Sequence, residues 1–272
     1  MLVTNRGESN GVEKFLSNLS EFTRFKIENG LVDVDAERMH YRELNALIRK
    51  LVNEGFKAFK LKNVCGQRYI GAGLNHNAVF RIYGTPGNDL GAFMKGPQIF
   101  VYGNVQDGCG DTMNESLIVV HGHAGDVAGY AMRGGKIFIQ GDVGYRAGIH
   151  MKGYHTTPVL VVGGCAGDFL GEYMAGGIIL LLGLDLNEEK MHKTKFIGTG
   201  MHGGVIYIRG KTPNIGKGAK IMDVDVSDLQ VIHGLVKQFC DFFNFNFNEI
   251  IKQEFTKIVP LSHRPYGKLY TS

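Results

Sequence analysis

Short apolar runs that end in glycine recur along the middle of this chain. The closing glycines are Gly84, Gly103, Gly122, Gly141, Gly163, Gly183 and Gly210. The first three intervals are nineteen residues each, and the next are twenty-two, twenty and twenty-seven. A second pattern, Gly-x-x-Met, recurs in step with the first, from Gly91/Met94 to Gly198/Met201. Two patterns in one register indicate an internal structural repeat.

Each repeat holds one apolar run of four or five residues and a glycine-rich remainder without helical periodicity. Such a unit is too short to bury a core alone, but units stacked about 4.8 Å apart can share one. Glycine supplies the positive φ that sharp corners need, and methionine fills the interior. The pattern therefore predicts a mainly β fold, a single-stranded parallel β-helix of about seven coils over residues 56–212.

The alternation of side chains along a strand separates an inner and an outer face. Residues four and two positions before each closing glycine are apolar and are expected inside: Phe80, Ile99, Ile118, Ile137, Val159, Ile179, Ile206, and Ile82, Val101, Val120, Ile139, Val161, Leu181, Ile208. Residues three positions before the glycine should face outward, yet several are apolar: Phe100, Val119, Phe138, Leu160 and Leu180. A contiguous apolar outer stripe must be covered, either by a terminal segment of this chain or by a partner subunit.

The N-terminal segment, residues 1–55, is expected to contain an amphipathic helix at about 36–53. Its apolar stripe includes Leu44, Leu47 and Leu51, and Asp35 is its expected N-cap. A weaker helical pattern covers 12–22.

The C-terminal segment, residues 213–272, is expected to form helices and an extended tail. Ser227 and Gln230 match a capping box that opens a helix to about Phe242. A second helix is predicted over 247–255, and the tail begins at Ser262. We expect both terminal segments to cap the ends of the β-helix, where strand edges would otherwise be exposed.

Composition and charge exclude several classes of protein. The net charge of +4 is spread over 272 residues without a Lys/Arg block, so no nucleic-acid partner is expected. The chain has no apolar stretch of membrane-spanning length and no apolar run near Met1, which favours a cytoplasmic protein without membrane contact. The four cysteines lie far apart, so no C-x-x-C zinc or iron–sulfur motif is present.

Polar residues at the corners are the candidates for chemistry. Asp107, Asp126 and Asp168 fall at nearly the same point of successive coils. Such a row could supply paired carboxylates for catalysis, whereas Asp next to Gly is also what a turn requires. The corner histidines could bind a metal or be solvated: His121, His123, His150, His155 and His202. The segment Gly198–Gly203 has the letters of a dinucleotide fingerprint, but an apolar strand follows it where a helix would be needed.

The dense glycine motifs resemble a known family. The stretch NVCGQRYIGAG (63–73) and the later YGTPGNDLGAFM, YGNVQDGCGDTM, HGHAGDVAGYAMRGG, GDVGYRAGIHMK and VGGCAGDFLGEYMAGG are similar to the C-terminal glycine-repeat (GXGXG) domain of the glutamate synthase large subunit. The likeness spans about 35–210, and is greatest to the form found as a separate chain. A more distant resemblance is to the glycine-repeat subunit of formylmethanofuran dehydrogenase.

The resemblance implies a right-handed β-helix and a structural role without catalytic residues. In glutamate synthase, other domains hydrolyse glutamine and, at a flavin and iron–sulfur site, add the ammonia to 2-oxoglutarate and reduce the product. The expected partners are therefore a glutaminase-type subunit and a synthase subunit that holds FMN and iron–sulfur clusters. No catalytic, cofactor-binding or metal-binding residue is placed on this chain, and self-association is left open.

Two other functions stay open at this point. One is an independent β-helix enzyme that uses the corner Asp and His residues. The other is a scaffold role in a different complex, of the formylmethanofuran dehydrogenase or N-methylglutamate synthase type.

Overall fold

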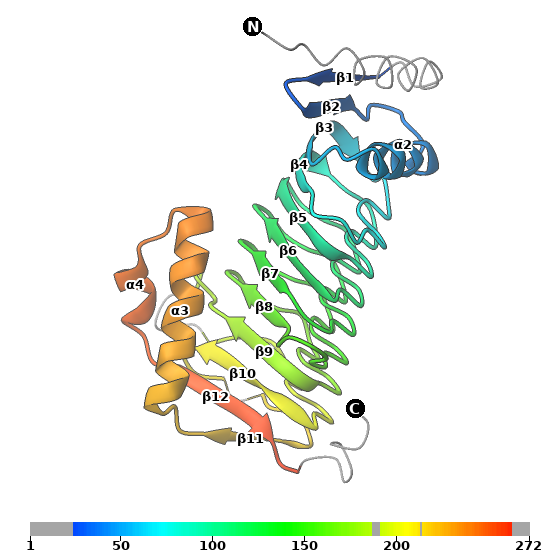
Figure 1. The fold of residues 1–272 in the computed structure, drawn as a ribbon. Helices are drawn as coiled ribbons and strands as arrows, with labels where there is room; N and C mark the ends of the chain where they lie inside the picture. Colours follow the sequence, from blue (N-terminus) through cyan, green and yellow to red (C-terminus); the bar gives the residue numbers. More distant parts are fainter. Residues whose placement is uncertain (1–23, 187–190, 213, 263–272) are drawn as a thin grey trace, which may run out of the picture.

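The computed structural model describes residues 24–186, 191–212 and 214–262. Its strands form one sheet in the order β1-β2-β3-β4-β5-β6-β7-β8-β9-β10-β12-β11. From β2 to β10, each strand lies parallel to the next strand in the chain. The protein is therefore a mainly β parallel solenoid, as predicted, with about six turns where about seven were expected (Figure 1).

The parallel strands are β2 (Leu31–Asp35), β3 (Ala58–Cys65), β4 (Val79–Thr85), β5 (Lys95–Tyr102), β6 (Glu115–Val120), β7 (Lys136–Ile139), β8 (Val159–Val162), β9 (Ala175–Leu181) and β10 (Gly203–Arg209). The antiparallel strands are β1 (Phe25–Glu28), β11 (Ala219–Met222) and β12 (Phe255–Pro260). The helices are α2 (Tyr41–Asn53), α3 (Val226–Phe243) and α4 (Phe247–Ile251).

The interior of the solenoid is a single apolar core. The inner strand residues of β4, Phe80 and Ile82, are fully buried, and so are their equivalents in the later coils. The repeated methionines are also buried in this core, which confirms their predicted role: Met94, Met113, Met132, Met151, Met174 and Met201. Burial of this apolar surface, shared between adjacent coils, is what holds the stack together.

The glycine-rich corner of each coil is a five-residue turn with three left-handed positions. In one such turn, Phe169, Gly171 and Tyr173 have φ of 65°, 66° and 51°. The middle position is glycine in every coil. At Gly171 this glycine faces the core closely, because a Cβ there would lie 2.6 Å from Ile206 Cδ1. The same turn recurs at 69–73, 89–93, 108–112, 127–131, 146–150 and 196–200.

The predicted register of β8 is wrong by one residue. Phe138 of β7 pairs with Val161, so Val159 and Val161 face outward, and Leu160 and Val162 point into the core. The reason is that Gly164, and not Gly163, continues the glycine column, since its N–H donates to the Gly141 carbonyl at 3.0 Å. Gly163 therefore does not mark the inner face of β8, and the inward residues lie one position later than predicted.

The N-terminal flank joins the sheet earlier than predicted. Strand β2 pairs in parallel with β3, so the parallel sheet begins before residue 56. The predicted apolar stripe of α2 is buried in the main core, but the N-cap of this helix is His40. Asp35 is instead the last residue of β2. The predicted helix at 12–22 lies outside the described residues.

The C-terminal flank contains the predicted helix α3, but its capping box is formed by Asp225 and Asp228 and not by Ser227 and Gln230. Helix α4 is shorter than predicted, because the chain turns at its end and enters β12. Strand β12 lies antiparallel between β10 and β11 and so pairs the backbone of the last parallel strand. Apart from Ser262, the predicted extended tail lies outside the described residues.

Candidate interaction surfaces

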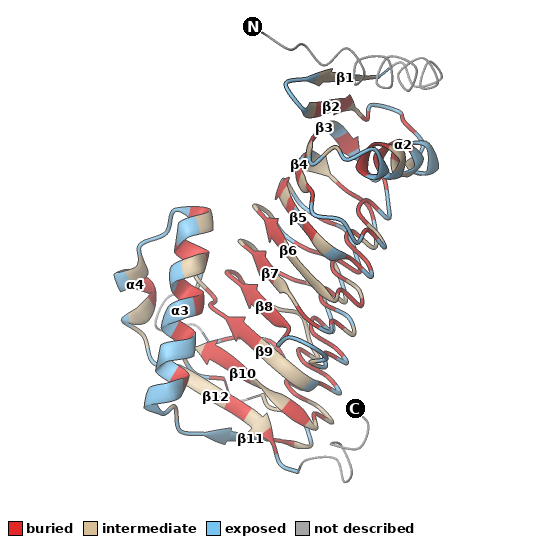
Figure 2. Cartoon of the chain, viewed as in Figure 1, coloured by how far each residue is buried: buried red, intermediate tan, exposed pale blue. Residues whose placement is uncertain are grey.

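The apolar outer stripe is covered by α3. Phe138, Val161 and Leu180 are fully buried in a second apolar cluster with residues of this helix, which include Ile232, Val236 and Phe239. In Figure 2, β7 and β8 are coloured almost entirely as buried. A Cβ on Gly163 would lie 2.6 Å from Phe239 Cζ, so the helix packs closely on the end of β8. Of the two covers considered for this stripe, the chain's own C-terminal segment is the one observed.

A buried polar network fixes the start of α3 on the sheet. Tyr207 Oη of β10 donates to Asp228 Oδ1 at 2.6 Å, and Lys257 Nζ of β12 donates to Asp228 Oδ2 at 2.6 Å. Desolvation raises the pKa of Asp228, but the hydrogen bonds from Lys257, Tyr207 and the Asp225 backbone together lower it below its ordinary value. The same hydrogen bond between Lys257 and Asp228 raises the pKa of Lys257 above its ordinary value.

We expect the stability of the protein to fall in acid through this network. A carboxylate with a lowered pKa in the folded state stabilises the protein fully above its unfolded-state pKa. That stabilisation is lost as the pH falls through the folded-state value. For Asp225, whose pKa is lowered to about 2 by hydrogen bonds from Ser227 and Asp228, the window runs from its ordinary 3.8 down to about 2. Urea unfolding midpoints measured across this window should decrease.

The substitution Asp228→Asn tests whether this network causes the loss of stability in acid. It keeps an acceptor for Tyr207 but removes the charge that faces Lys257, so a loss of about 1.5–3 kcal/mol is expected at pH 7. Its midpoint should then decrease less than that of the wild type as the pH falls below 3.8, the ordinary value from which the pKa of Asp228 is lowered. An unchanged slope would show that other carboxylates govern acid unfolding.

The predicted aspartate row is a ladder of hydrogen bonds between coils. Asp107 Oδ1 accepts from the backbone N–H of Asp126 at 2.8 Å, and Asp126 Oδ1 accepts from that of Tyr145 at 2.8 Å. Asp168 accepts in the same way from the N–H of Lys195 at 2.8 Å. Each carboxylate therefore satisfies an amide of the next coil, which is the turn-forming interpretation of this row.

A second acceptor row was not recognised in the sequence. Asn104 Oδ1 accepts a hydrogen bond from the backbone N–H of His123 at 2.9 Å. In the next two coils, His123 Nδ1 accepts from the N–H of Asp142 at 2.9 Å, and Asp142 Oδ1 accepts from the N–H of Cys165 at 2.6 Å. These three acceptor residues each follow a glycine at the end of a strand, which is the signal that could have identified them.

Asp126→Asn and Asp126→Ala separate a structural from a catalytic role. The amide oxygen of Asn can still accept from the N–H of Tyr145, so its stability should stay within about 0.5 kcal/mol of the wild type. Ala removes the acceptor and should cost about 0.5–1.5 kcal/mol in urea unfolding. An equal loss with Asn and with Ala would contradict the ladder, since only the charge of Asp126 would then matter and not its hydrogen bond to the N–H of Tyr145.

The predicted corner histidines do not converge. His121 stacks on Tyr102 with ring centroids 4.9 Å apart, and burial lowers its pKa. His150 stacks on Tyr173 at 5.5 Å, and His155 contacts Tyr154 at 4.0 Å. Among the described residues, no group of three or more His, Cys, Asp or Glu side chains could hold a metal ion. The segment Gly198–Gly203 is a corner followed by β10, as expected.

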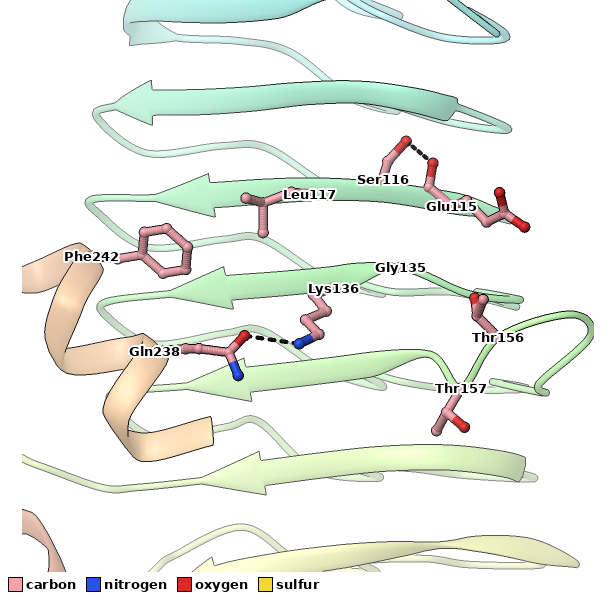
Figure 3. A pocket seen from close by; sticks show the side chains of 9 residues that line it. All are labelled: Glu115, Ser116, Leu117, Gly135, Lys136, Thr156, Thr157, Gln238 and Phe242. Atoms are coloured by element: carbon pink, nitrogen blue, oxygen red, sulfur yellow. Dashed lines mark hydrogen bonds between the residues drawn. The ribbon is translucent and has the colours of Figure 1, made fainter. Parts of the chain in front are cut away.

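An open groove of about 560 Å³ lies between α3 and the beginnings of β6 and β7 (Figure 3). Its lining includes Glu115, Ser116, Lys136, Gln238 and Phe242. Lys136 Nζ donates to Gln238 Oε1 at 2.8 Å and ties the helix to β7. The Ser116 hydroxyl donates to the backbone carbonyl of Glu115 and not to a catalytic base. The groove thus has the features of a helix–sheet seam.

Within the part of the chain that the structure describes, no helix combines the length and apolar character needed to cross a bilayer.

Comparison with known proteins identifies the family. The sequence profile described as the GXGXG motif matches residues 16–262. A protein of Methanocaldococcus jannaschii, described as the uncharacterized protein MJ1350, is 49% identical over 251 residues, which cover 88% of this chain and 96% of that relative. The five-residue corners described above have left-handed residues at the three glycine positions of this motif. The chain therefore belongs to the GXGXG motif family, the family of the glutamate synthase C-terminal domain.

Proposed function

We propose that this chain is a cytoplasmic, non-catalytic scaffold subunit of a glutamate-synthase-type complex. A glutaminase-type subunit releases ammonia from glutamine, and a synthase subunit adds it to 2-oxoglutarate and reduces the product. FMN and iron–sulfur clusters belong to the synthase subunit. The solenoid holds the two subunits in one particle, so that the ammonia released by one is used by the other.

The observation that carries this proposal is the use of the corner carboxylates. Asp107, Asp126 and Asp168 formed the strongest catalytic candidate in the sequence, and each accepts a hydrogen bond from a backbone amide of the next coil. Such carboxylates rigidify the stack and hold its surfaces in fixed relation over several coils. Membership of the GXGXG family supports the same role.

Reconstitution tests the proposal. The chain would be mixed with purified glutaminase-type and synthase-type glutamate synthase chains from the same organism. We expect one particle containing all three, with glutamine-dependent glutamate formation that decreases strongly when this chain is omitted. Ammonia-dependent synthesis by the synthase chain should change little. Turnover of glutamine or 2-oxoglutarate by this chain alone would refute the proposal.

A further inference from the structure

Bulky side chains occupy left-handed backbone positions on one exposed edge of the solenoid. In each five-residue corner, the two outer left-handed positions flank the buried middle glycine. Glycine adopts this conformation without a steric penalty, whereas other L-residues are strained there. The chain uses glycine at Gly73, Gly108 and Gly200, and earlier coils have the single bulky residues Tyr69 and Phe93 at such positions. In the three consecutive coils nearest β10 these positions hold a whole group of bulky residues, Arg146, His150, Phe169, Tyr173 and Phe196, with φ between 51° and 65°.

These side chains form one continuous surface. Phe169 stacks on Phe196 with centroids 4.9 Å apart, and the Arg146 guanidinium lies 5.3 Å from the centre of the Phe169 ring. In the second row, His150 contacts Tyr173 at 5.5 Å and Tyr130 at 6.0 Å. Arg146 Nε donates to Glu172 Oε2 at 3.0 Å and joins the two rows. The aromatic corner is defined as Tyr130, Arg146, His150, Phe169, Tyr173 and Phe196.

The stability of the fold does not explain why these side chains are present. Tyr173 and Phe196 are 47% and 49% exposed, so little apolar burial offsets the backbone strain. None of the six belongs to the apolar cluster that α3 covers. A contiguous group of such exposed, strained side chains is expected where binding and not stability selects them.

The charge around the aromatic corner defines its partner. Arg133, Lys152 and Lys195 are exposed, and Lys195 directly precedes Phe196. Arg133 and Lys152 occupy the same position of successive coils. The backbone N–H of Arg133 donates to the carbonyl of Met113, and that of Lys152 donates to the carbonyl of Met132, the equivalent residue one coil later. Glu172, the acidic residue between the rows, is already paired with Arg146. The surface therefore presents aromatic rings flanked by exposed cations, which complement carboxylates.

A protein fits this surface better than a nucleic acid. The aspartate row runs along its border, since Asp168 directly precedes Phe169, and Asp126 accepts from the N–H of Tyr145, the residue before Arg146. A phosphate backbone that followed the stack would cross these carboxylates and be repelled. The carboxylates of a folded protein are separate from one another, so they can reach the cations without crossing the aspartate row.

We infer that the aromatic corner is the docking surface for a protein partner whose contacting face is rich in Asp and Glu. This inference rests on the proposed function, in which that partner is the glutaminase-type or the synthase-type subunit. Aromatic and arginine side chains of this kind supply most of the binding energy at protein interfaces. The strain in the free chain is then the cost of presenting rigid side chains to the partner.

The test combines binding and stability measurements on two variants, Tyr173→Gly and Phe196→Gly. Binding to the purified glutaminase-type and synthase-type chains would be measured by surface plasmon resonance, and Tm by calorimetry. We expect the affinity for one of the two chains to fall at least about 10-fold. Since relief of left-handed strain offsets the lost ring contacts, Tm should be unchanged or raised by about 2–4 °C. Added salt should weaken wild-type binding.

Phe93→Gly is the matched control. Phe93 has φ 57°, is 57% exposed, and occupies the same position as Tyr173 in an earlier coil, away from the aromatic corner. This variant should bind like the wild type and show the same absence of thermal destabilisation.

The possible outcomes separate the two proposals. If the wild type binds a subunit and both variants bind it equally well, the docking surface is wrong and the proposed function stands. If the wild type binds neither subunit, both proposals fall. A marked decrease in Tm of the two variants would show that these residues serve folding. Binding of a single-stranded RNA oligonucleotide that is abolished by Tyr173→Gly would overturn the protein partner in favour of nucleic acid.

Discussion

Replacing Gly171 by Ala is expected to destabilise the protein by about 2–5 kcal/mol. The left-handed conformation at φ +66° costs an L-residue about 1–2 kcal/mol. The added methyl group would also lie 2.6 Å from Ile206 Cδ1 inside the core, and such overpacking costs about 1–3 kcal/mol. Urea unfolding at pH 7, followed by circular dichroism, would measure the sum.

Gly73→Ala separates the two contributions. Gly73 has φ +67°, but the nearest atom to its added Cβ would be Arg49 Nη1 at 3.9 Å. Only the backbone cost of about 1–2 kcal/mol is therefore expected. Equal losses in the two variants would contradict the view that the middle glycine of each corner is required by the core.

The repeat explains why the fold could be predicted and why one coil could not be aligned. Strand-ending glycines and buried methionines recur at fixed positions, so the sequence reveals both the stacking and the inner face. At β8, however, two glycines are adjacent, and either could continue the column. The pairing of Phe138 with Val161 and the hydrogen bond from Gly164 to Gly141 decide between them. A sequence pattern cannot fix the register of a strand when the glycine that marks the end of the strand is followed by a second glycine.

The ends of the solenoid show the limit of local signals. Residues 247–255 have apolar spacing compatible with a helix, but Phe255–Pro260 is a strand because β10 offers unpaired backbone groups at the end of the stack. Tertiary pairing overrides local propensity at such an edge. The apolar stripe, by contrast, was visible in the sequence, although the segment that covers it could not be chosen without the structure.

The candidate surfaces were only partly predictable for a related reason. The aspartate row was visible because its members fall at nearly the same point of successive coils. The aromatic corner was not, because Phe169, Tyr173 and Phe196 do not favour left-handed backbone, and residue type alone therefore points away from it. Alignment of the corners on their middle glycine would have placed Phe169 and Phe196 at the position of Gly108, and Tyr173 at that of Gly73 and Gly200.

Replacing Phe239 by Ala is expected to cost about 3–5 kcal/mol and to loosen α3 from the sheet. Phe239 is fully buried between the helix and the outer face of the solenoid, so its removal leaves a cavity in the seam. Since α3 covers Phe138, Val161 and Leu180, partial undocking would expose a contiguous apolar stripe. We expect a lower urea midpoint and, by light scattering, concentration-dependent association.

Lys237→Ala on the exposed side of α3 controls for changes in the helix itself. Lys237 makes no contribution to the buried cluster, so its loss should change stability by less than about 0.5 kcal/mol. If Phe239→Ala had the same urea midpoint as Lys237→Ala and did not associate, the apolar stripe would not depend on α3 for its cover. A lower midpoint with association would show that α3 is an integral layer of the fold. Partners must then bind the solenoid on the surfaces that α3 leaves open.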